Sequence, residues 1–374
     1  MIIMKKKILF LITNLAHGGA ERVLVNLVNN LDKNKYDITV MTLFDVGVNK
    51  QNLSNHITYK YLFSRSFHGI KLITSIFPAK ILHKLFIRNK YDIEVSYLEG
   101  PPAKIISGGN NNTKKIAWIH IELNDDKLFS EGFLNKQDAL NTYGKFNKIV
   151  CVSETVKSQF IKVSGMDNRN IKVLYNTNET ETIKSISKQP VDDLVFGDGI
   201  PTIVSVAKIE HSKGYDRLLE VHKRLIDEGI QHRVYVFGIG GEKNKLELLS
   251  QKYGVEDTFK FVGFKDKPYN YLSKADLYVC SSRREGFSTA VTEALIVGIP
   301  VVSTECSGAK ELLGENNEYG IVVENSTEGV YQGVRKMLLD NELRKNYKEQ
   351  AIARGEYFSK EKTVKAVEEM LDLL

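Results

Sequence analysis

Cysteine, proline and tryptophan are scarce in this sequence of 374 residues, which contains 3 Cys, 7 Pro and 1 Trp. The cysteines at 151, 280 and 306 are far apart and show no metal-binding spacing, so we expect reduced thiols in a cytosolic protein. No apolar run approaches the ~20 residues that cross a bilayer, and the first residues lack the apolar core of a signal peptide. Hydrophobic residues make up 42% of the chain, which excludes a disordered protein. The length is sufficient for two globular domains.

Several motifs of catalysis are also missing. The sequence contains no HExxH, no Cys–His cluster and no GxSxG, which argues against metal-dependent and serine-dependent hydrolysis. It has neither GxGxxG nor the P-loop pattern. No Asp-x-Asp follows a predicted strand, although this is the simplest way to hold Mg²⁺ or Mn²⁺ on a diphosphate. We therefore expect neither a metal nor a cofactor.

Acidic residues are absent between Asp45 and Asp92, a stretch that contains eight Lys and Arg. Residues 1–178 carry 25 Lys and Arg against 14 Asp and Glu, a charge of +11, whereas the remainder carries −5. Within the basic stretch, residues 67–90 interleave bases with aromatic and aliphatic residues, as in helices that lie on anionic membranes. Nucleic acid is a competing partner, but no nucleic-acid-binding motif accompanies the charge. A packed helix with a solvated basic face is the third interpretation.

The dominant pattern is an alternation of short β-branched runs with longer amphipathic stretches, which predicts parallel sheets covered on both faces. Two such series predict an α/β fold of two doubly wound domains. We expect an N-terminal domain at 1–178, a polar linker at 179–200, a C-terminal domain at 201–356 and a final helix at 357–374. The predicted strands are 7–12, 37–43, 57–62, 92–98, 115–120, 148–153, 172–175, 202–207, 233–238, 259–263, 276–281, 301–306 and 321–324.

The strongest local motif lies between the predicted strand at 276–281 and the helix that follows it. Ser288 is suited to cap that helix, and Gly286 lets the backbone approach a ligand. The first N–H groups of the helix would attract an anion such as phosphate. Glu293 lies one turn into the helix and Glu285 at the strand tip, so both could accept hydrogen bonds from a ligand. A loop glutamate and a first-turn glutamate that favours the helix dipole are an equally simple explanation.

Three further turns carry candidate residues. Lys208 and Lys213 flank the loop after the strand at 202–207 and could neutralise a diphosphate, although single loop lysines are more often solvated. Gly18 and Gly19 open the first helix, and Gly240 follows a strand of the second domain. Without context, these glycines indicate only tight turns. His120 ends a strand at an expected binding edge, where a packed or surface histidine is the more frequent occurrence.

Taken in order, these motifs resemble those of the retaining GT-B glycosyltransferases of family 4, especially bacterial enzymes that build surface polysaccharides. The resemblance extends along nearly the whole chain, including the run Gly298–Pro300. It departs from the family at Ala207-Lys208-Ile209, where Gly-Arg-Leu is usual, so the planar guanidinium fork is lost. Lys208 keeps the positive charge at this position, so we expect activity to persist.

The resemblance implies two Rossmann-like domains facing each other across a cleft, with a nucleotide sugar held by the second and an acceptor by the first. In this family Glu293 would bind the ribose and Lys213 the diphosphate, while His120 would touch the transferred sugar. The implied catalytic residues are His120, Lys208, Lys213 and Glu285. The implied donor-binding residues are Gly18, Gly19, Gly240, Gly286, Phe287, Ser288, Thr289, Ala290 and Glu293.

The resulting hypothesis is a metal-independent, retaining hexosyl- or N-acetylhexosaminyltransferase that uses a UDP-sugar. Its acceptor would be a saccharide, in particular one linked to a lipid diphosphate, and segment 67–90 would hold the enzyme on the inner membrane face. We do not expect nucleic acid as a partner, and the oligomeric state stays open. Two alternatives are a non-catalytic GT-B protein that stabilises a partner transferase and a sugar-nucleotide epimerase of the same fold.

Overall fold

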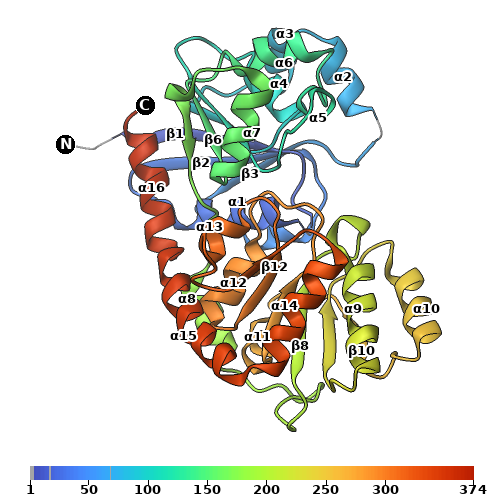
Figure 1. Cartoon of the computed structure of the whole chain (residues 1–374). Helices are drawn as coiled ribbons and strands as arrows, with labels where there is room; N and C mark the ends of the chain where they lie inside the picture. The colour runs from blue at the N-terminus through green and yellow to red at the C-terminus, as the bar shows by residue number, and fades with distance from the viewer. Residues whose placement is uncertain (1–3, 17, 68) are drawn as a thin grey trace. The chain divides into compact units, whose positions relative to one another are not determined.

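The computed structural model describes residues 4–16, 18–67 and 69–374 and divides into two compact units. Unit 1 comprises Met1–Thr177 together with Glu361–Leu374, and unit 2 comprises Asn178–Lys360. In Figure 1 the colours from blue to green trace the first part of unit 1, and the red end of the chain returns to it as helix α16. The predicted fold class of two doubly wound α/β domains is confirmed, because each unit is built on one parallel sheet.

Unit 1 contains a seven-stranded parallel sheet in the order β3-β2-β1-β4-β5-β6-β7. Its inner strand β1 is fully buried from Ile8 to Ile12, as expected for a continuous apolar run in a parallel sheet. The strand order reverses between β1 and β4, and ligands bind beyond the carboxyl ends of strands at such a switch point. The strands are β1 (Lys6–Ile12), β2 (Tyr36–Phe44), β3 (Thr58–Phe63), β4 (Ile93–Ser96), β5 (Lys114–Ile119), β6 (Lys148–Cys151) and β7 (Ile171–Val173).

The helices of unit 1 follow these strands along the chain. They are α1 (Gly19–Asn30), α2 (Ile70–Ile76), α3 (Ala79–Phe86), α4 (Pro101–Ile106), α5 (Asp126–Phe129), α6 (Lys136–Tyr143), α7 (Glu154–Ser164) and α16 (Lys360–Asp372). Helix α16 is tied to the rest of the unit by polar contacts as well as by apolar packing. The Asp32 N–H donates to Glu368 at 2.7 Å, and the Tyr36 hydroxyl donates to Asp372 at 2.7 Å.

The basic segment 67–90, which the sequence suggested as one amphipathic helix, is two short helices. Pro78 explains the break, because its ring disfavours helical geometry in the preceding residue. Phe77 accordingly has an extended backbone with φ −83° and ψ 140°, and α3 begins after Pro78. His68, within this segment, lies outside the described residues. None of the helices in the described residues combines the length and hydropathy that a bilayer crossing requires.

Unit 2 contains a six-stranded parallel sheet in the order β10-β9-β8-β11-β12-β13, with its switch point between β8 and β11. Its strands are β8 (Thr202–Val206), β9 (Arg233–Phe237), β10 (Phe259–Gly263), β11 (Leu277–Cys280), β12 (Val301–Thr304) and β13 (Ile321–Val323). Its helices are α8 (Thr180–Ser187), α9 (Tyr215–Asp227), α10 (Lys243–Tyr253), α11 (Tyr269–Lys274), α12 (Thr289–Val297), α13 (Ala309–Leu313), α14 (Thr327–Leu339) and α15 (Asn341–Tyr357).

Helix α8 occupies part of the segment 179–200, which the sequence predicts as a linker. Its Ile183 is 1% exposed and packs with Tyr269 of α11 and Ile296 of α12. The apolar spacing of Ile183 and Ile186 lies within a segment dominated by polar residues, which obscured the helix in the sequence. This part of the chain is therefore integrated into the packing of unit 2.

Candidate active site

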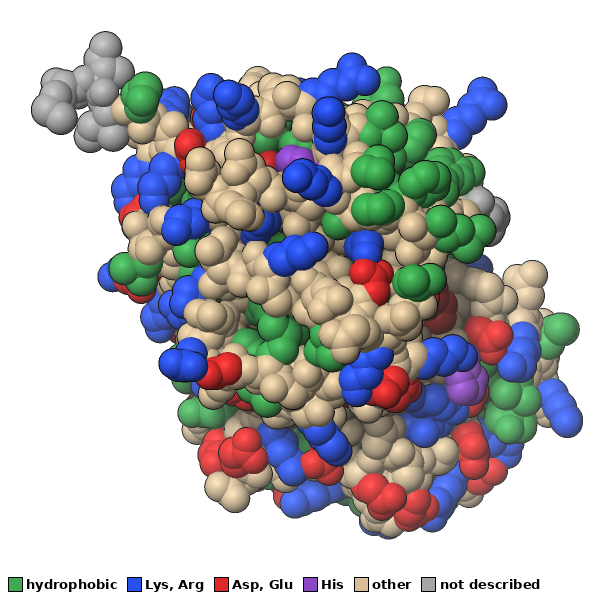
Figure 2. Space-filling model, turned by 90° about the horizontal axis from the view of Figure 1, so that it is seen from above, with side chains coloured by type: hydrophobic (Ala, Val, Ile, Leu, Met, Phe, Trp, Pro, Cys, Tyr) green, Lys and Arg blue, Asp and Glu red, His purple; other side chains and the backbone are tan. Residues whose placement is uncertain are grey.

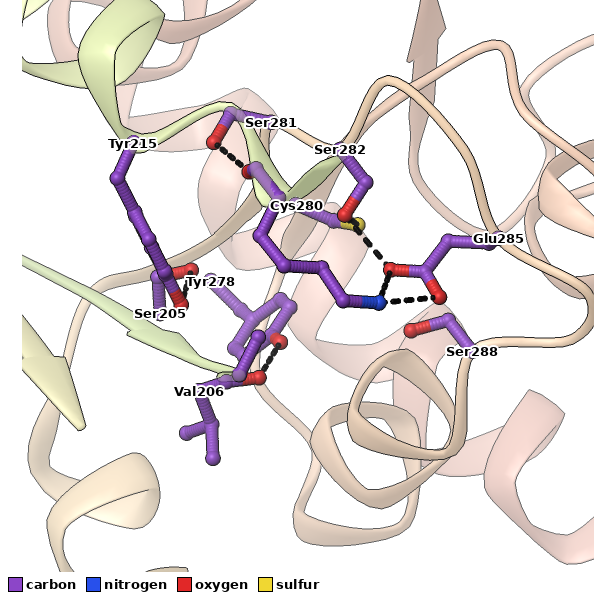
Figure 3. Close-up of a pocket in the computed structure, with 11 residues that line it drawn as sticks. Ser205, Val206, Tyr215, Tyr278, Cys280, Ser281, Ser282, Glu285 and Ser288 are labelled. Atoms are coloured by element: carbon purple, nitrogen blue, oxygen red, sulfur yellow. Dashed lines mark hydrogen bonds and ion pairs between the residues drawn. The ribbon is translucent and has the colours of Figure 1, made fainter. Parts of the chain in front are cut away.

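The switch point of unit 2 brings two loops together at the carboxyl ends of β8 and β11. One loop runs from Val206 to the start of α9, and the other runs from Cys280 to the start of α12. They form one pocket, shown in Figure 3, whose lining combines hydroxyl groups with a lysine and a glutamate. The lining residues are Ser205, Val206, Ala207, Lys213, Tyr215, Tyr278, Cys280, Ser281, Ser282, Glu285 and Ser288.

The centre of the pocket is an ion pair between Lys213 and Glu285. The Lys213 ammonium donates to both carboxylate oxygens of Glu285 at 2.8 Å (Figure 3). The two side chains are only 22% and 12% exposed. Burial by itself lowers the pKa of Lys213, but the charge and hydrogen bonds of Glu285 outweigh it, so the pKa of Lys213 is raised. The lysine is therefore a fixed positive charge in a largely dry setting.

Both members of the ion pair are oriented by hydroxyl groups of the β11 loop. The Ser282 hydroxyl donates to Glu285 at 2.6 Å, and the Ser281 hydroxyl donates to the carbonyl of Lys213 at 3.0 Å (Figure 3). Gly214 allows the loops to approach this closely, because its φ is +67° and a Cβ there would lie 2.0 Å from the Ser281 carbonyl oxygen. Any other residue at this position would push the loops apart.

A second ion pair fixes the outer side of the two loops. Arg283 donates to both carboxylate oxygens of Asp216 at 2.7 and 2.6 Å, and also to the carbonyl of His211 at 2.8 Å. The Arg283 backbone N–H donates to the carbonyl of Ser212 at 2.7 Å. The guanidinium thus joins the β11 loop to the 3-10 turn His211–Lys213, which carries the pocket lysine.

The N-terminus of α12 borders the same pocket. Ser288 caps the helix by accepting from the Val291 N–H, as predicted, and leaves the amides of Thr289 and Ala290 at the helix start, where they have no intrahelical acceptor. Glu293, one turn further, is 5% exposed and accepts from the hydroxyl of Tyr269 at 3.1 Å. This contact holds the Glu293 carboxylate in place.

Phe287, between Gly286 and Ser288, is not among the residues that line the pocket. Its side chain is 5% exposed and packs edge-on against Phe358, with ring centroids 5.7 Å apart. Gly308 lies against the Phe287 ring, where a Cβ would come within 2.7 Å of it. The preceding Gly286 and the following Ser288 are thereby held at the mouth of α12.

Two predicted residues of unit 2 lie beside this pocket but do not line it. Lys208 is exposed in the loop after β8 and is not among the residues that line the pocket. Gly240 packs against Ile209, whose carbonyl oxygen would lie 2.2 Å from a Cβ at that position. Gly240 therefore shapes the turn after β9, and its carbonyl accepts from the Lys243 N–H at 3.3 Å.

In unit 1, His120 follows β5, next to the switch-point strand β4. Its imidazole is buried against Tyr97 with ring centroids 4.8 Å apart, and burial lowers its pKa to about 3. Its Nε2 is buried and has no hydrogen-bond partner among the described residues. Glu99 accepts from the backbone N–H groups of both His120 and Ile121, the latter at 3.0 Å. The histidine is thus neutral and held at a fixed point of the loop.

Gly18 and Gly19 open helix α1 at the carboxyl end of β1, the other switch-point strand of unit 1. Gly18 is the N-cap residue, and a Cβ on it would collide with the Glu21 carboxylate at 1.8 Å. A glycine at this position leaves the first amides of α1 accessible to a ligand. The predicted residues therefore fall into two sets, one in each unit, in segments that follow the carboxyl ends of strands.

The sequence did not reveal the residues that hold the site residues in place. They are Glu99, Asp216, Tyr269, Ser281, Ser282 and Arg283. Ser281, Ser282 and Arg283 belong to the motif singled out above, but the partners of Ser281 and Arg283 are distant in sequence. Only Glu99 had a local signal, a carboxylate directly after a buried strand at the expected binding edge.

The chemistry of this site does not include a recognisable metal centre. Among the described residues, no cluster of three or more His, Cys, Asp and Glu has a metal-binding arrangement. Cys280 lines the pocket as a free thiol, and a hydrogen bond from Cys306 outweighs burial and lowers the pKa of Cys280 below its usual value. A buried cation, a carboxylate and helix amides instead suit a ligand that bears both phosphate and hydroxyl groups.

Comparison with known families agrees with this geometry. The model for glycosyl transferases group 1 matches residues 191–354, and that for glycosyltransferase family 4 matches residues 17–181. The two matches together leave only short segments uncovered and fall on the two units in turn. The chain belongs to the family 4 glycosyltransferases. The family resemblance seen in the sequence motifs is therefore confirmed.

Relatives of this glycosyltransferase include enzymes of glycolipid and polysaccharide synthesis. One, from Campylobacter jejuni, is N-acetylgalactosamine-N,N'-diacetylbacillosaminyl-diphospho-undecaprenol 4-alpha-N-acetylgalactosaminyltransferase. It is 30% identical over 59% of this chain and 58% of its own length, so the match spans less than two thirds of that relative. The lipopolysaccharide core biosynthesis glycosyltransferase LpsE of Rhizobium meliloti is 24% identical over 87% of both chains.

Solved structures show the same fold as this glycosyltransferase. Anabaena Alr3699/HepE, determined with UDP and glucose, matches 99% of this chain and all of its own at 18% identity, with a TM-score of 0.76. A glycosyltransferase from Rickettsia africae matches 98% of this chain and 97% of its own at 19% identity, with a TM-score of 0.77. The predicted GT-B fold is thereby confirmed.

Proposed function

We propose that this family 4 glycosyltransferase binds a nucleotide diphosphate sugar in unit 2 and transfers the sugar with retained configuration to a saccharide acceptor. The observation that best supports this proposal is the Lys213–Glu285 ion pair at the β8/β11 switch point, beside the N-terminus of α12. A diphosphate requires a cation and amide donors, whereas a sugar requires acceptors for its hydroxyl groups. This pocket offers both within one loop pair.

Lys213 is proposed to stabilise the departing diphosphate. An ammonium has three N–H groups, and the two oxygens of Glu285 accept two of them. The third remains for a phosphate oxygen, with the amides of Thr289 and Ala290 as further donors at the positive end of α12. Charge that accumulates on the leaving group is thus met by groups already in position.

The sugar and the nucleoside are assigned to the two carboxylates. Glu285 and the backbone of Gly286–Ser288 would hold the sugar, and Glu293 would accept from the ribose hydroxyls. In unit 1, His120 would touch the transferred sugar as a neutral imidazole, because its low pKa excludes an imidazolium near neutral pH. The acceptor hydroxyl attacks on the face of the departing diphosphate, which takes its proton.

We infer a UDP-sugar as donor and a lipid-linked saccharide as acceptor, in the synthesis of a surface polysaccharide. Support comes from the relatives, because the Campylobacter enzyme is named for an acceptor on undecaprenyl diphosphate and the Anabaena structure was determined with UDP. The sugar transferred is a hexose or an N-acetylhexosamine.

A ligand screen by thermal unfolding tests the donor assignment. UDP should stabilise the protein by about 2.7 kcal/mol at 100 times its Kd, and GDP and ADP should do so less. Lys213→Ala should lower kcat/KM for transfer by about 10²-fold, as expected for a lost transition-state donor. Lys310→Ala is the matched control, since Lys310 pairs with Glu305 on the exposed surface of the same unit.

The same assays distinguish the alternatives. A sugar nucleotide converted to an isomer without acceptor would identify an epimerase. Failure of every nucleotide to bind, with increased activity of an added transferase, would identify a non-catalytic stabilising protein. Product with inverted anomeric configuration would refute the retaining mechanism.

A further inference from the structure

Unit 1 presents large hydrophobic side chains to solvent on two neighbouring helices. Figure 2 looks at the face on which α2 and α3 lie and shows hydrophobic side chains gathered there among Lys and Arg. We call this surface the α2–α3 face. Its apolar members, with exposed fractions, are Leu72 (62%), Ile76 (60%), Phe77 (48%), Ile81 (54%) and Leu85 (57%). Soluble proteins rarely gather such residues without a binding role.

The exposure follows from helical spacing. Leu72 and Ile76 are one turn apart on α2, and Ile81 and Leu85 are one turn apart on α3, so each pair shares a helix face. Phe77 lies at the bend between the helices. The buried face of α2 and α3 is formed by other residues, among them Ile70, Thr74, Ala79 and Leu82.

Polar contacts hold the two helices in this orientation. The Thr74 hydroxyl is fully buried and lies 3.2 Å from the Gly132 carbonyl oxygen. His83 on α3 is hydrogen-bonded to Glu94 of the buried strand β4 at 2.8 Å. Turning α3 to bury its exposed apolar residues would separate His83 from the carboxylate of Glu94, which is 2% exposed. The face is therefore a fixed part of the fold.

The charge on the α2–α3 face is predominantly positive. Lys80, Lys84, Arg88 and Lys90 are all exposed, and no acid occurs in the sequence between Asp45 and Asp92. Lys80 and Lys84 adjoin Ile81 and Leu85 along α3, so bases border the apolar residues. An acid from elsewhere, Glu131, pairs with Lys71 at the surface.

We propose that the α2–α3 face inserts into an anionic lipid bilayer. Its aliphatic and aromatic residues would enter the boundary between headgroups and acyl chains, and its lysines and arginine would contact lipid phosphates. The combination favours a bilayer, because the exposed apolar side chains match the acyl chains and the bases around them match the phosphates of the headgroups. A partner that is held by charge alone would not require exposed apolar side chains. A second copy of this face would place bases opposite bases, which repel each other.

The sequence interpretation placed bases together with aromatic and aliphatic residues on one amphipathic helix. The structure adds five exposed apolar side chains at a bend between two helices, so binding should have a component that salt does not remove. The inference does not depend on the identity of the donor or on the residues of unit 2. It would place an enzyme that acts on lipid-linked saccharides where such acceptors reside.

Vesicle flotation of the full chain tests the proposal. The protein should float with phosphatidylcholine vesicles that contain phosphatidylglycerol and bind phosphatidylcholine alone much more weakly. Ile81→Ser with Leu85→Ser should weaken binding about ten-fold and leave a weaker, salt-sensitive remainder. Lys80→Glu with Lys84→Glu should weaken it at least ~25-fold, because each base near such a surface contributes roughly five-fold.

Matched controls come from exposed positions of unit 2. Leu248→Ser with Leu339→Ser removes two side chains that are 67% and 56% exposed, and Lys252→Glu with Lys274→Glu reverses two exposed charges. Both controls should float like the unmodified protein. UDP-induced thermal stabilisation should be unchanged in all four variants, which separates this test from that of the proposed function.

A fluorescence measurement reports insertion directly. The sole tryptophan of the chain, Trp118, is 3% exposed in β5 and should not respond to lipids that carry a bromine quencher. Phe77→Trp adds a reporter at the bend, which brominated vesicles should quench. Absence of flotation by the unmodified protein, lack of quenching at position 77 or equal loss in the controls would overturn the proposal. A dimer that the Ile81/Leu85 variant dissociates would also overturn it and identify a second copy as the occupant.

Discussion

Replacing Glu285 by glutamine tests whether the pocket ion pair also stabilises unit 2. The change preserves the shape of the side chain and an oxygen that can accept from Lys213. It removes the negative charge that keeps the pKa of Lys213 raised against the effect of burial. The variant therefore leaves an ammonium in a largely enclosed pocket without its counter-charge.

The expected cost follows from the burial of the pair. Removing one partner of a fully buried ion pair costs about 3–5 kcal/mol. Here the side chains are 22% and 12% exposed, so water reaches Lys213. Glu285→Gln should therefore lower the free energy of unfolding by about 2 kcal/mol. For a unit of this size, that corresponds to a decrease in Tm of roughly 4–8 °C.

Differential scanning calorimetry near neutral pH measures this decrease, with Glu305→Gln as the control. Glu305 also forms an ion pair, with Lys310, but the two side chains are 53% and 45% exposed. Such a surface pair contributes about 0–1 kcal/mol, so the control should shift Tm far less. Equal decreases in Tm in the two variants would refute the argument that burial makes the Lys213–Glu285 pair contribute more to stability than a surface pair.

Three further predictions concern both units. Burial lowers the pKa of His222 to about 3 and that of His232 to about 4, so each neutral imidazole stabilises the fold above pH 6.5, and this contribution is lost as the pH falls toward 4. Thermal unfolding should show that the free energy of unfolding is lower by about 2 kcal/mol per histidine at pH 5 than at pH 7. A free energy of unfolding that is constant from pH 7 to pH 5 would contradict this. Ser288→Ala should lower the free energy of unfolding, measured by chemical denaturation, by about 1 kcal/mol, because α12 loses its cap. An unchanged denaturation midpoint would show that the cap is dispensable. Glu99→Ala should reduce kcat/KM by about ten-fold through misplacement of His120, whereas Glu99→Gln should retain most activity; equal kinetics for both would reject a positioning role.

Most of the fold could be predicted because the apolar runs of parallel strands are continuous and separated by helices. Every predicted strand is present, and the ends differ by a few residues, as for the predicted 92–98 against β4 at Ile93–Ser96. The sequence was less informative where a helix lacked a long apolar stripe, as in α8. It also missed the break at Pro78, because the residues on either side share the same mixture of bases and aliphatics.

The site could be predicted in part because its residues occupy strand ends and helix starts. The cap of α12 by Ser288 is confirmed. The contact between Lys213 and Glu285 joins residues 72 positions apart and depends on β8 and β11 being neighbours. The order of the apolar runs along the chain does not give the order of the strands in the sheet. Neither this pair nor the Arg283–Asp216 ion pair could therefore be predicted from the sequence.

Helix α16 has a consequence for how the chain is made. Residues 361–374 belong to unit 1 but leave the ribosome only after all of unit 2 has been translated. The carboxylates of Glu368 and Asp372, which bond to residues 32 and 36, are thus missing while the nascent sheet of unit 1 first assembles. The unit that begins translation first is completed last, and a premature stop codon near residue 360 would damage the amino-terminal half of the protein.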